Sequence, residues 1–353
     1  MGEKQRRRQK EGGIEFIMND YSKDFIEKLK GVAGKKSKVE AVMDGVIAKG
    51  INQVYLVGCG GSLAVMYPGK YMIDKYAGGV QTHIYPSREF TLVAPQNLGK
   101  KSLVVLASHS GGTEETLEAA DFSRERGAVT IGFSRDADSK LSEKVDFSFS
   151  YHGENGITES KMMFLYMIVF KLIKSLNMKF PYDEGMKAIE RLPQALTNIR
   201  ESIEEEGTRF AKDHKDEEKI YTTAGGPTYG IAYAYAVCIL LEMQWIHSAP
   251  FHAGEFFHGP FEIIEDHVPL ILIMGEDDTR PMAERALAFA QKYTSKLTVI
   301  DSKNYELPDI SEEIRPLLSP FVVWTVLYRY AQYLETERDH SLELRRYMGI
   351  IDY

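Results

Sequence analysis

The sequence predicts an α/β protein in which two units of the same design follow one another. Short apolar runs alternate with helical patterns over the first half of the chain, which is typical of a parallel sheet covered by helices. Two of these runs end in turns rich in glycine and hydroxyl side chains. A later segment, 219–230, repeats the order of apolar run, glycine turn and helix found at 53–64, which indicates that the fold is duplicated.

Composition limits the functions that the chain can have. The 353 residues are 44% hydrophobic and 27% charged, so a sizeable core is available for one large domain or two. The formal net charge of −8 argues against a nucleic-acid surface, and no apolar run of about 18 residues predicts a membrane span. Two cysteines are too few for a disulfide framework. We therefore expect a cytoplasmic protein with neither nucleic-acid nor membrane partners.

The N-terminal residues are expected to form a disordered leader, native or added. Their basic run, Arg6-Arg7-Arg8, has no apolar stretch beside it and so does not indicate a targeting signal. The predicted boundaries are 1–20 for the leader, 21–180 for the first unit with phosphate-binding turns, 181–214 for linking helices, 215–340 for the second unit with catalytic groups, and 341–353 for a C-terminal tail over the site.

Five strands are predicted in the first unit, after a helical stretch at 21–48. The first strand, at 53–57, runs into the turn Gly58-Cys59-Gly60-Gly61-Ser62 and then into a helix at 63–76. A strand, a glycine turn and a helix start can hold an anion on backbone amides. The glycine spacing matches neither the dinucleotide fingerprint nor the triphosphate loop. The other predicted strands are 81–85, 102–107, 129–133 and 147–151, with a helix at 113–126.

A second hydroxyl-rich turn follows the strand at 102–107, which we expect at the centre of the sheet. Its sequence is Ser108-His109-Ser110-Gly111-Gly112-Thr113. The carboxyl ends of parallel strands share one edge, where ligands bind, so the two turns together suit a phosphate monoester. The alternative is that the hydroxyls only cap helices and the glycines only form turns. The candidate phosphate-binding residues are Gly61, Ser62, Ser108, Ser110 and Thr113.

In the second unit, the repeated glycine turn has Pro227 and Tyr229 near the position of Ser62. We therefore expect that this turn has lost phosphate binding and that the second half supplies catalytic groups instead. Further strands are predicted at 269–274 and 297–300, and helices at 161–176, 182–214, 281–293 and 320–335.

The stretch 238–265 carries the densest set of acid–base side chains. Residues 231–246 predict a buried helix, on which Glu242 is a charge on an otherwise apolar surface. His258 precedes Gly259-Pro260, a pair that presents side chains on loops. Glu242 is thus a candidate base and His258 a candidate acid; the alternatives are a carboxylate held by an arginine or a backbone amide, and a hydrogen-bonded loop histidine. The other members, His247, His252, Glu255, Glu262 and Glu265, complete no compact metal-ligand set, so no metal is expected.

With these residues assembled, the chain resembles the tandem sugar isomerase (SIS) domain proteins, and within them the fructosamine-6-phosphate deglycases. The resemblance rests on both hydroxyl-rich turns, on 242–248 and 252–263, and on Arg345-Arg346-Tyr347 near the end of the chain. It implies two tandem SIS domains, each a three-layer αβα sandwich with a mainly parallel five-stranded sheet. It also implies a homodimer with a shared active site, into which His258 of the partner subunit reaches.

The same resemblance implies cleavage of a 6-phosphorylated fructosamine, such as fructoselysine 6-phosphate, into glucose 6-phosphate and a free amine. Glu242 would move the carbon protons and His258 would assist ring opening, with no cofactor because the substrate nitrogen is the electron sink. The isomerase half of glucosamine-6-phosphate synthase is more weakly similar. It has a lysine near its C-terminus where this chain has Arg346, a candidate substrate-binding residue that cannot form a Schiff base.

Several activities remain open at this point. One base, one acid and a phosphate site would also serve an aldose–ketose isomerase, a glucoselysine-6-phosphate deglycase, or an amino-sugar phosphate isomerase or deaminase. A non-catalytic phosphosugar sensor is the alternative from another class. Such sensors usually carry a helix-turn-helix, for which this acidic chain has neither the room nor the basic surface.

Overall fold

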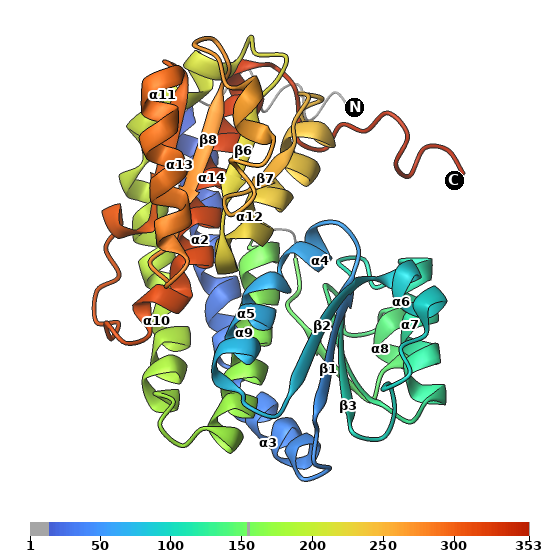
Figure 1. Ribbon diagram of the computed structural model, residues 1–353. Helices are drawn as coiled ribbons and strands as arrows, with labels where there is room; N and C mark the ends of the chain where they lie inside the picture. The colour runs from blue at the N-terminus through green and yellow to red at the C-terminus, as the bar shows by residue number, and fades with distance from the viewer. Residues whose placement is uncertain (1–13, 154–155, 353) are drawn as a thin grey trace.

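The computed structural model describes residues 14–153 and 156–352, which fold around two parallel β-sheets (Figure 1). The chain enters through α2 (Ile14–Ala33) and α3 (Lys36–Ile47). The predicted helical stretch at 21–48 is therefore two helices, and α2 begins inside the segment predicted as a leader. Residues 1–13, which form most of that leader, lie outside the described residues.

The first sheet has five parallel strands with β3 at the centre, as the sequence predicts, and their order is β2-β1-β3-β4-β5. Six of six residues of β3 are buried, as expected of a central strand with helices on both faces. The strands are β1 (Gln53–Gly58), β2 (Gln81–Pro86), β3 (Ser102–Ala107), β4 (Val129–Ser134) and β5 (Phe147–Ser150). The helices between them are α4 (Gly61–Ala64), α5 (Tyr67–Tyr76), α6 (Ser87–Val93), α7 (Glu114–Glu125) and α8 (Lys140–Lys144).

The predicted linking segment consists of packed helices. It forms α10 (Tyr182–Ser202) and α11 (Glu204–His214), preceded by the long apolar helix α9 (Ile157–Leu176). Helix α10 packs against α2, α9 and the last helix, α14 (Ser319–Glu337), so it contributes to the interior and does not bridge separate bodies through solvent.

The second sheet is also parallel, in the order β7-β6-β8-β9. The prediction of five strands is wrong here, because the sheet has four over the described residues. The short edge strand β7 was not predicted; its proline is tolerated because an edge strand leaves one side unpaired. The elements are β6 (Tyr221–Ala224), α12 (Tyr229–Tyr233), β7 (Pro250–His252), β8 (Leu270–Met274), α13 (Arg280–Tyr293) and β9 (Leu297–Asp301).

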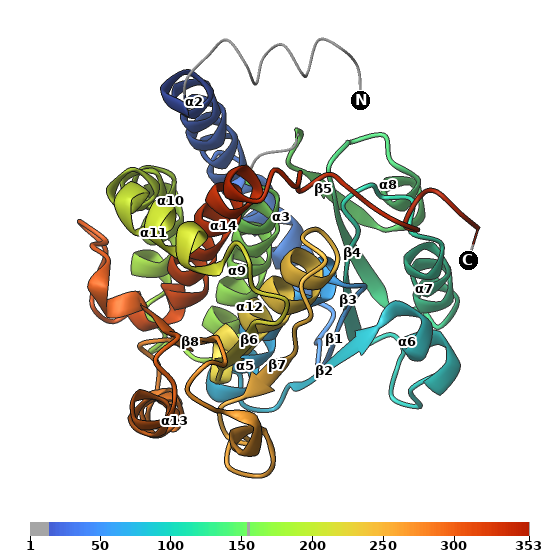
Figure 2. The ribbon, with the colours of Figure 1, turned by 90° about the horizontal axis from the view of Figure 1, so that it is seen from above.

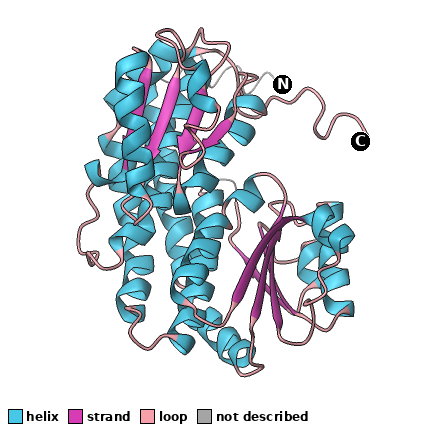
Figure 3. Cartoon of the chain, viewed as in Figure 1, coloured by secondary structure: helices cyan, strands magenta, loops and turns pink. Residues whose placement is uncertain are grey.

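Apolar side chains pack in three places, which together give alternating layers of helix and sheet. The largest cluster joins the facing sides of the two sheets, from Leu56 on β1 to Ile273 on β8, through α9, α10 and α14. Smaller clusters lie under α6, α7 and α8 on the outer face of the first sheet, and under α13 on the second. Figures 1 and 2 show α9 on the side of the first sheet that faces the second, and Figure 3 shows helices covering both sheets.

Candidate active site

The two hydroxyl-rich turns lie side by side at the carboxyl edge of the first sheet. Strands β1 and β3 are hydrogen-bonded neighbours, and Gly58 pairs with Ala107 at the last position of both strands. The segments 59–62 and 108–113 therefore leave the sheet at the same level. This is the edge at which parallel sheets bind ligands.

In the turn after β3, hydroxyl groups and backbone amides form a closed set of contacts. The Ser108 and Thr113 hydroxyls are 2.8 Å apart, and the Gly111 amide donates to Ser108 Oγ over 3.1 Å. Ser110 is exposed and its Oγ accepts from the Gly112 amide, which leaves its proton free to donate to a ligand. Thr113 precedes α7 but makes no side-chain cap, so helix capping does not explain its hydroxyl.

The turn after β1 receives a lysine from α9 and a cysteine from the second half. Ser62 is only 7% exposed, and Lys161 Nζ donates to its Oγ over 3.1 Å. Gly60 has φ +50°, a backbone conformation that favours glycine. A Cβ on Gly61 would lie 3.7 Å from Cys238 Sγ, so the helix that carries Cys238 packs directly against this turn.

Glu242 follows a π-helical segment and pairs with an arginine from the tail. The helix predicted at 231–246 ends at Leu241, so Glu242 lies in the turn after it and not on the helix as predicted. It consists of α12 and the π-helix η2 (Ala234–Leu241), a rare form that often occurs at functional sites. The Glu242 side chain is 24% exposed, and its Oε1 lies 2.9 Å from Nη2 of Arg345. Burial raises the pKa of Glu242, while the positive charge and hydrogen bond of Arg345 act in the opposite direction. The carboxylate is thus held by an arginine, which is the alternative that the sequence analysis gives beside a candidate base.

The Cys238 thiol joins these groups into one site. Burial raises the pKa of Cys238 to about 11, the charge of Glu242 raises it further, and the charges of Lys161 and Arg345 oppose this. A carboxylate, two cations and a protonated thiol therefore lie together between the first glycine turn and the tail. The sequence analysis missed Lys161 and Arg345; a lone lysine in the apolar run of α9 was the available signal for the first.

The first residues of the tail contact the segment that follows Glu242. The Gln244 side chain donates to the His340 carbonyl over 2.8 Å, and the Arg346 guanidinium lies over the Trp245 ring, 4.0 Å from its centroid. Arg345 therefore reaches the Glu242 carboxylate, while Arg346, the candidate substrate-binding residue, stacks on Trp245. Beyond these residues the tail extends away from α14 (Figure 1).

The other predicted acid, His258, lies on the turn after β7 with an exposed side chain. Its backbone amide donates to the Glu255 carbonyl over 2.9 Å. In the described part of the chain, no hydrogen bond or ion pair joins its imidazole to Glu242. The phenylalanines beside it, Phe256, Phe257 and Phe261, pack on Phe289 of α13, so the chain's own core accounts for that aromatic cluster.

Comparisons with known proteins identify the family. The SIS domain profile matches residues 49–173. A curated relative from Bacillus subtilis, fructosamine deglycase FrlB, is 41% identical over 90% of this chain and 97% of its own length. The chain belongs to the SIS domain family, among the fructosamine deglycases. Fructoselysine 6-phosphate deglycase from Escherichia coli is 28% identical over 96% of this chain and 98% of its own.

Solved structures agree on the fold of this SIS domain protein. A proposed phosphosugar isomerase from Bacillus subtilis is 40% identical, with a TM-score of 0.86 over 91% of this chain and 99% of that one. The C-terminal domain of the Francisella tularensis glucosamine-fructose-6-phosphate aminotransferase has a TM-score of 0.74 over 92% of this chain and 96% of that domain. At 16% identity, this second likeness shows the fold alone.

The repeated glycine turn of the second half offers no phosphate site. Asp277 is 5% exposed, and its Oδ1 accepts from the Thr279 amide and hydroxyl over 2.9 and 2.6 Å. A Cβ on Gly226 would lie 2.8 Å from that oxygen. A buried carboxylate thus lies beside this turn, where its negative charge would repel an anion. His252, at the end of β7, accepts from the Gly254 amide over 3.1 Å and faces Tyr229 instead of the first turn.

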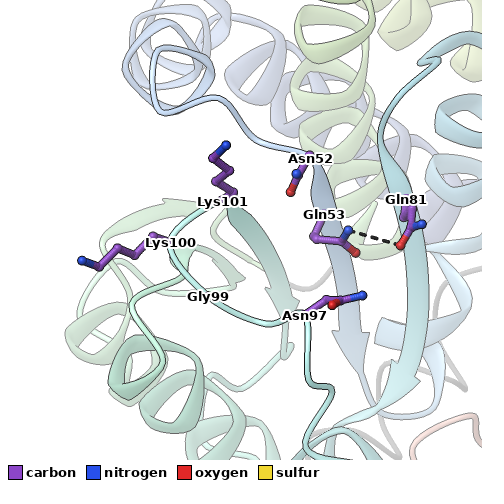
Figure 4. Close-up of a pocket in the computed structure, with 7 residues that line it drawn as sticks. All are labelled: Asn52, Gln53, Gln81, Asn97, Gly99, Lys100 and Lys101. Carbon is purple, nitrogen blue, oxygen red and sulfur yellow. Dashed lines mark hydrogen bonds between the residues drawn. The ribbon is translucent and has the colours of Figure 1, made fainter.

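Other parts of this SIS domain protein offer less chemistry. Over residues 14–153 and 156–352, no three His, Cys, Asp or Glu side chains lie close enough to share a metal ion, and no helix is long and apolar enough to cross a membrane. A polar pocket lies at the opposite, amino-terminal ends of β1, β2 and β3 (Figure 4), where Gln53 donates to Gln81 over 3.2 Å. It is lined by Asn52, Gln53, Gln81, Asn97, Gly99, Lys100 and Lys101.

Proposed function

We propose that this SIS domain protein is a deglycase that cleaves a 6-phosphorylated fructosamine with water to glucose 6-phosphate and a free amine. The observation that carries the proposal is the half-buried Glu242 carboxylate, held between Arg345 and the thiol that touches the first glycine turn. Curated relatives over nearly the whole chain are a fructosamine deglycase and fructoselysine 6-phosphate deglycases, which supports this substrate class.

The proposed chemistry moves a carbonyl group from C2 to C1 of the sugar. Glu242 removes a proton from C1, and the electron pair of that C–H bond forms a C1=C2 double bond while the C2 oxygen takes up a proton. The proton returned to C2 leaves a C1 imine, which water hydrolyses to the aldehyde and the amine. Arg345 supports the first step because its positive charge favours the ionised carboxylate and so opposes the rise in pKa that burial causes.

The proposed phosphate site is the paired turns of the first sheet. Ser110 is exposed and has a hydroxyl proton free to donate. The other candidates lie on the turns that follow the two adjacent strands: Ser108 and Thr113 after β3, and Gly61 and Ser62 after β1. Donors of this kind, together with the amino end of α7, suit a phosphate monoester. Arg346 of the tail stays a candidate for contact with the substrate.

The proposed assembly is a homodimer with a shared active site. His258 is exposed and has no side-chain partner within the described residues, as expected of a group that acts in another subunit. The tail adds exposed apolar side chains that a second copy would cover, which supports the same assembly. These are Leu344, Tyr347, Met348, Ile350 and Ile351. Because both cysteines are free thiols, we place the reaction in the cytoplasm.

The test is incubation of the protein with a panel of 6-phosphorylated Amadori compounds, with glucose 6-phosphate measured by a coupled assay. We expect release of glucose 6-phosphate and free amine from at least one compound, and none with Glu242→Gln. Conversion of a phosphosugar to its isomer without amine release would indicate an isomerase. Tight binding of phosphosugars without any turnover would indicate a sensor.

A further inference from the structure

Lys161 is a buried cation with little to neutralise it. It is 3% exposed, in a helix whose next nine residues, 162–170, are all buried. Within the described residues, one hydrogen bond holds its ammonium group, to the neutral hydroxyl of Ser62 over 3.1 Å. No ion pair to Lys161 occurs there. An ammonium group carries three donors, so two remain for a ligand.

Such a charge is costly to bury unless it has a task. Taking an ammonium group out of water costs several kcal/mol, and a hydrogen bond to a neutral hydroxyl offsets only part of that free energy. Burial accordingly lowers the pKa of Lys161 to about 8, although Cys238 and Glu159 act in the opposite direction. Glu159 lies two residues away on the same helix and makes no ion pair with Lys161 in the part of the chain that the structure describes; the charge of Arg200 acts on this carboxyl as well.

The position of the ammonium group indicates the task. It reaches the first glycine turn at Ser62, and Cys238 of the second half packs on the same turn at Gly61. Both Lys161 and Glu242 are near enough to Cys238 to act on its pKa. Because Ser62 Oγ accepts a hydrogen bond from Lys161, the hydroxyl proton of Ser62 points away from the lysine. The hydroxyl can therefore donate that proton to another group. A hydroxyl donor beside a positive charge favours a ligand that is an anion or carries an electron-rich oxygen.

We propose that Lys161 is a positioning residue of the binding site, which fixes the Ser62 hydroxyl as a donor and supplies the positive charge that holds an anionic phosphosugar at the first glycine turn. This role deepens the proposed function, on which it rests for the substrate class. It assigns the first turn an active part in binding, alongside the hydroxyls that follow β3.

The test replaces the cation by an apolar group of similar length. We expect Lys161→Met to bind fructose 6-phosphate and inorganic phosphate about 10- to 100-fold more weakly in titration calorimetry, the factor for a lost hydrogen bond to a charged group. Its melting temperature should stay the same or rise, because the buried charge is removed. The matched control is Lys171→Met on the same helix, whose ammonium pairs with Asp44 over 2.8 Å; its binding should not change.

A second variant shows whether Lys161 acts through Ser62. Ser62→Ala and Lys161→Met should each weaken binding. The double variant should bind no more weakly than the weaker-binding single variant, because both substitutions remove the same Lys161–Ser62 pair. Parental binding by Lys161→Met, full additivity in the double variant, or a lower melting temperature with unchanged binding per folded molecule would each overturn the proposal. Since the assay measures binding alone, a protein that binds phosphosugars but releases no amine would refute the deglycase function and leave the role of Lys161 intact.

Discussion

Removal of the Arg345 guanidinium should shift the pH dependence of catalysis. Glu242 can act as a base only when it is ionised, and Arg345 is the group that lowers its pKa against the effect of burial. In Arg345→Gln that opposition is lost, so the pKa of Glu242 rises. The acid limb of the kcat/KM profile, which reports the free enzyme, should therefore move to higher pH.

The size of the effect follows from the geometry of the ion pair. The two side chains are 24% and 20% exposed and their atoms are 2.9 Å apart, so water screens the pair only in part. A hydrogen bond to a charged group contributes about 1.5–3 kcal/mol, and about 1.4 kcal/mol corresponds to a factor of ten. On the acid limb, the variant should therefore be about 10- to 100-fold slower than the parent, and the difference should shrink as pH rises.

The assay is release of glucose 6-phosphate from a fructosamine 6-phosphate at a series of pH values, with melting curves to show that each variant is folded. Arg346→Gln is the matched control, because it removes the adjacent positive charge, which stacks on Trp245 and does not contact the carboxylate. Its acid limb should not move, whatever happens to its KM. An unshifted limb in Arg345→Gln, or a variant faster than the parent at every pH, would refute the view that Arg345 keeps Glu242 ionised.

Three further predictions concern the base, the phosphate site and the assembly. Glu242→Gln should bind substrate nearly as well as the parent, turn over at least about 100-fold more slowly, and fail to exchange the C1 proton with deuterated water; near-parental turnover would exclude it as the base. Ser110→Ala should bind a phosphosugar about 10- to 100-fold more weakly in calorimetry while it stays folded, and unchanged affinity would remove Ser110 from the site. A mixture of inactive Glu242→Gln and His258→Ala chains should regain activity through heterodimers, and exchange of subunits without recovery would place His258 in its own chain.

Much of the fold could be predicted because the first sheet obeys local rules. Its strands are runs of four to six residues, and the central strand is apolar along most of its length and fully buried. Strand β7 could not be predicted, because its three residues include a proline and a histidine and show no strand pattern. It forms only because the backbone of β6 offers an open edge, which is a property of the folded sheet and not of the segment.

The candidate site could be predicted in part, for a related reason. Glu242 stands out in the sequence because a charge in a predicted apolar helix is costly and therefore informative. Lys161 carries the same signal, but its meaning depends on contact with Ser62, which is 99 residues away in the sequence. The contact of Arg345 with Glu242 depends on the return of the tail to a segment about a hundred residues earlier. Spacing carries no information on such contacts, so neither contact was predicted.

The ion pair with Arg345 favours the ionised form of the proposed base in a half-buried place. Arg345 approaches Glu242 from the tail, and its positive charge opposes the effect of burial on the pKa of the carboxyl. The Cys238 thiol adds no charge beside them, because burial and the Glu242 charge both raise its pKa. Since Glu242 follows η2 in the second half and Arg345 belongs to the tail, the ion pair forms only when the tail has folded back onto this segment.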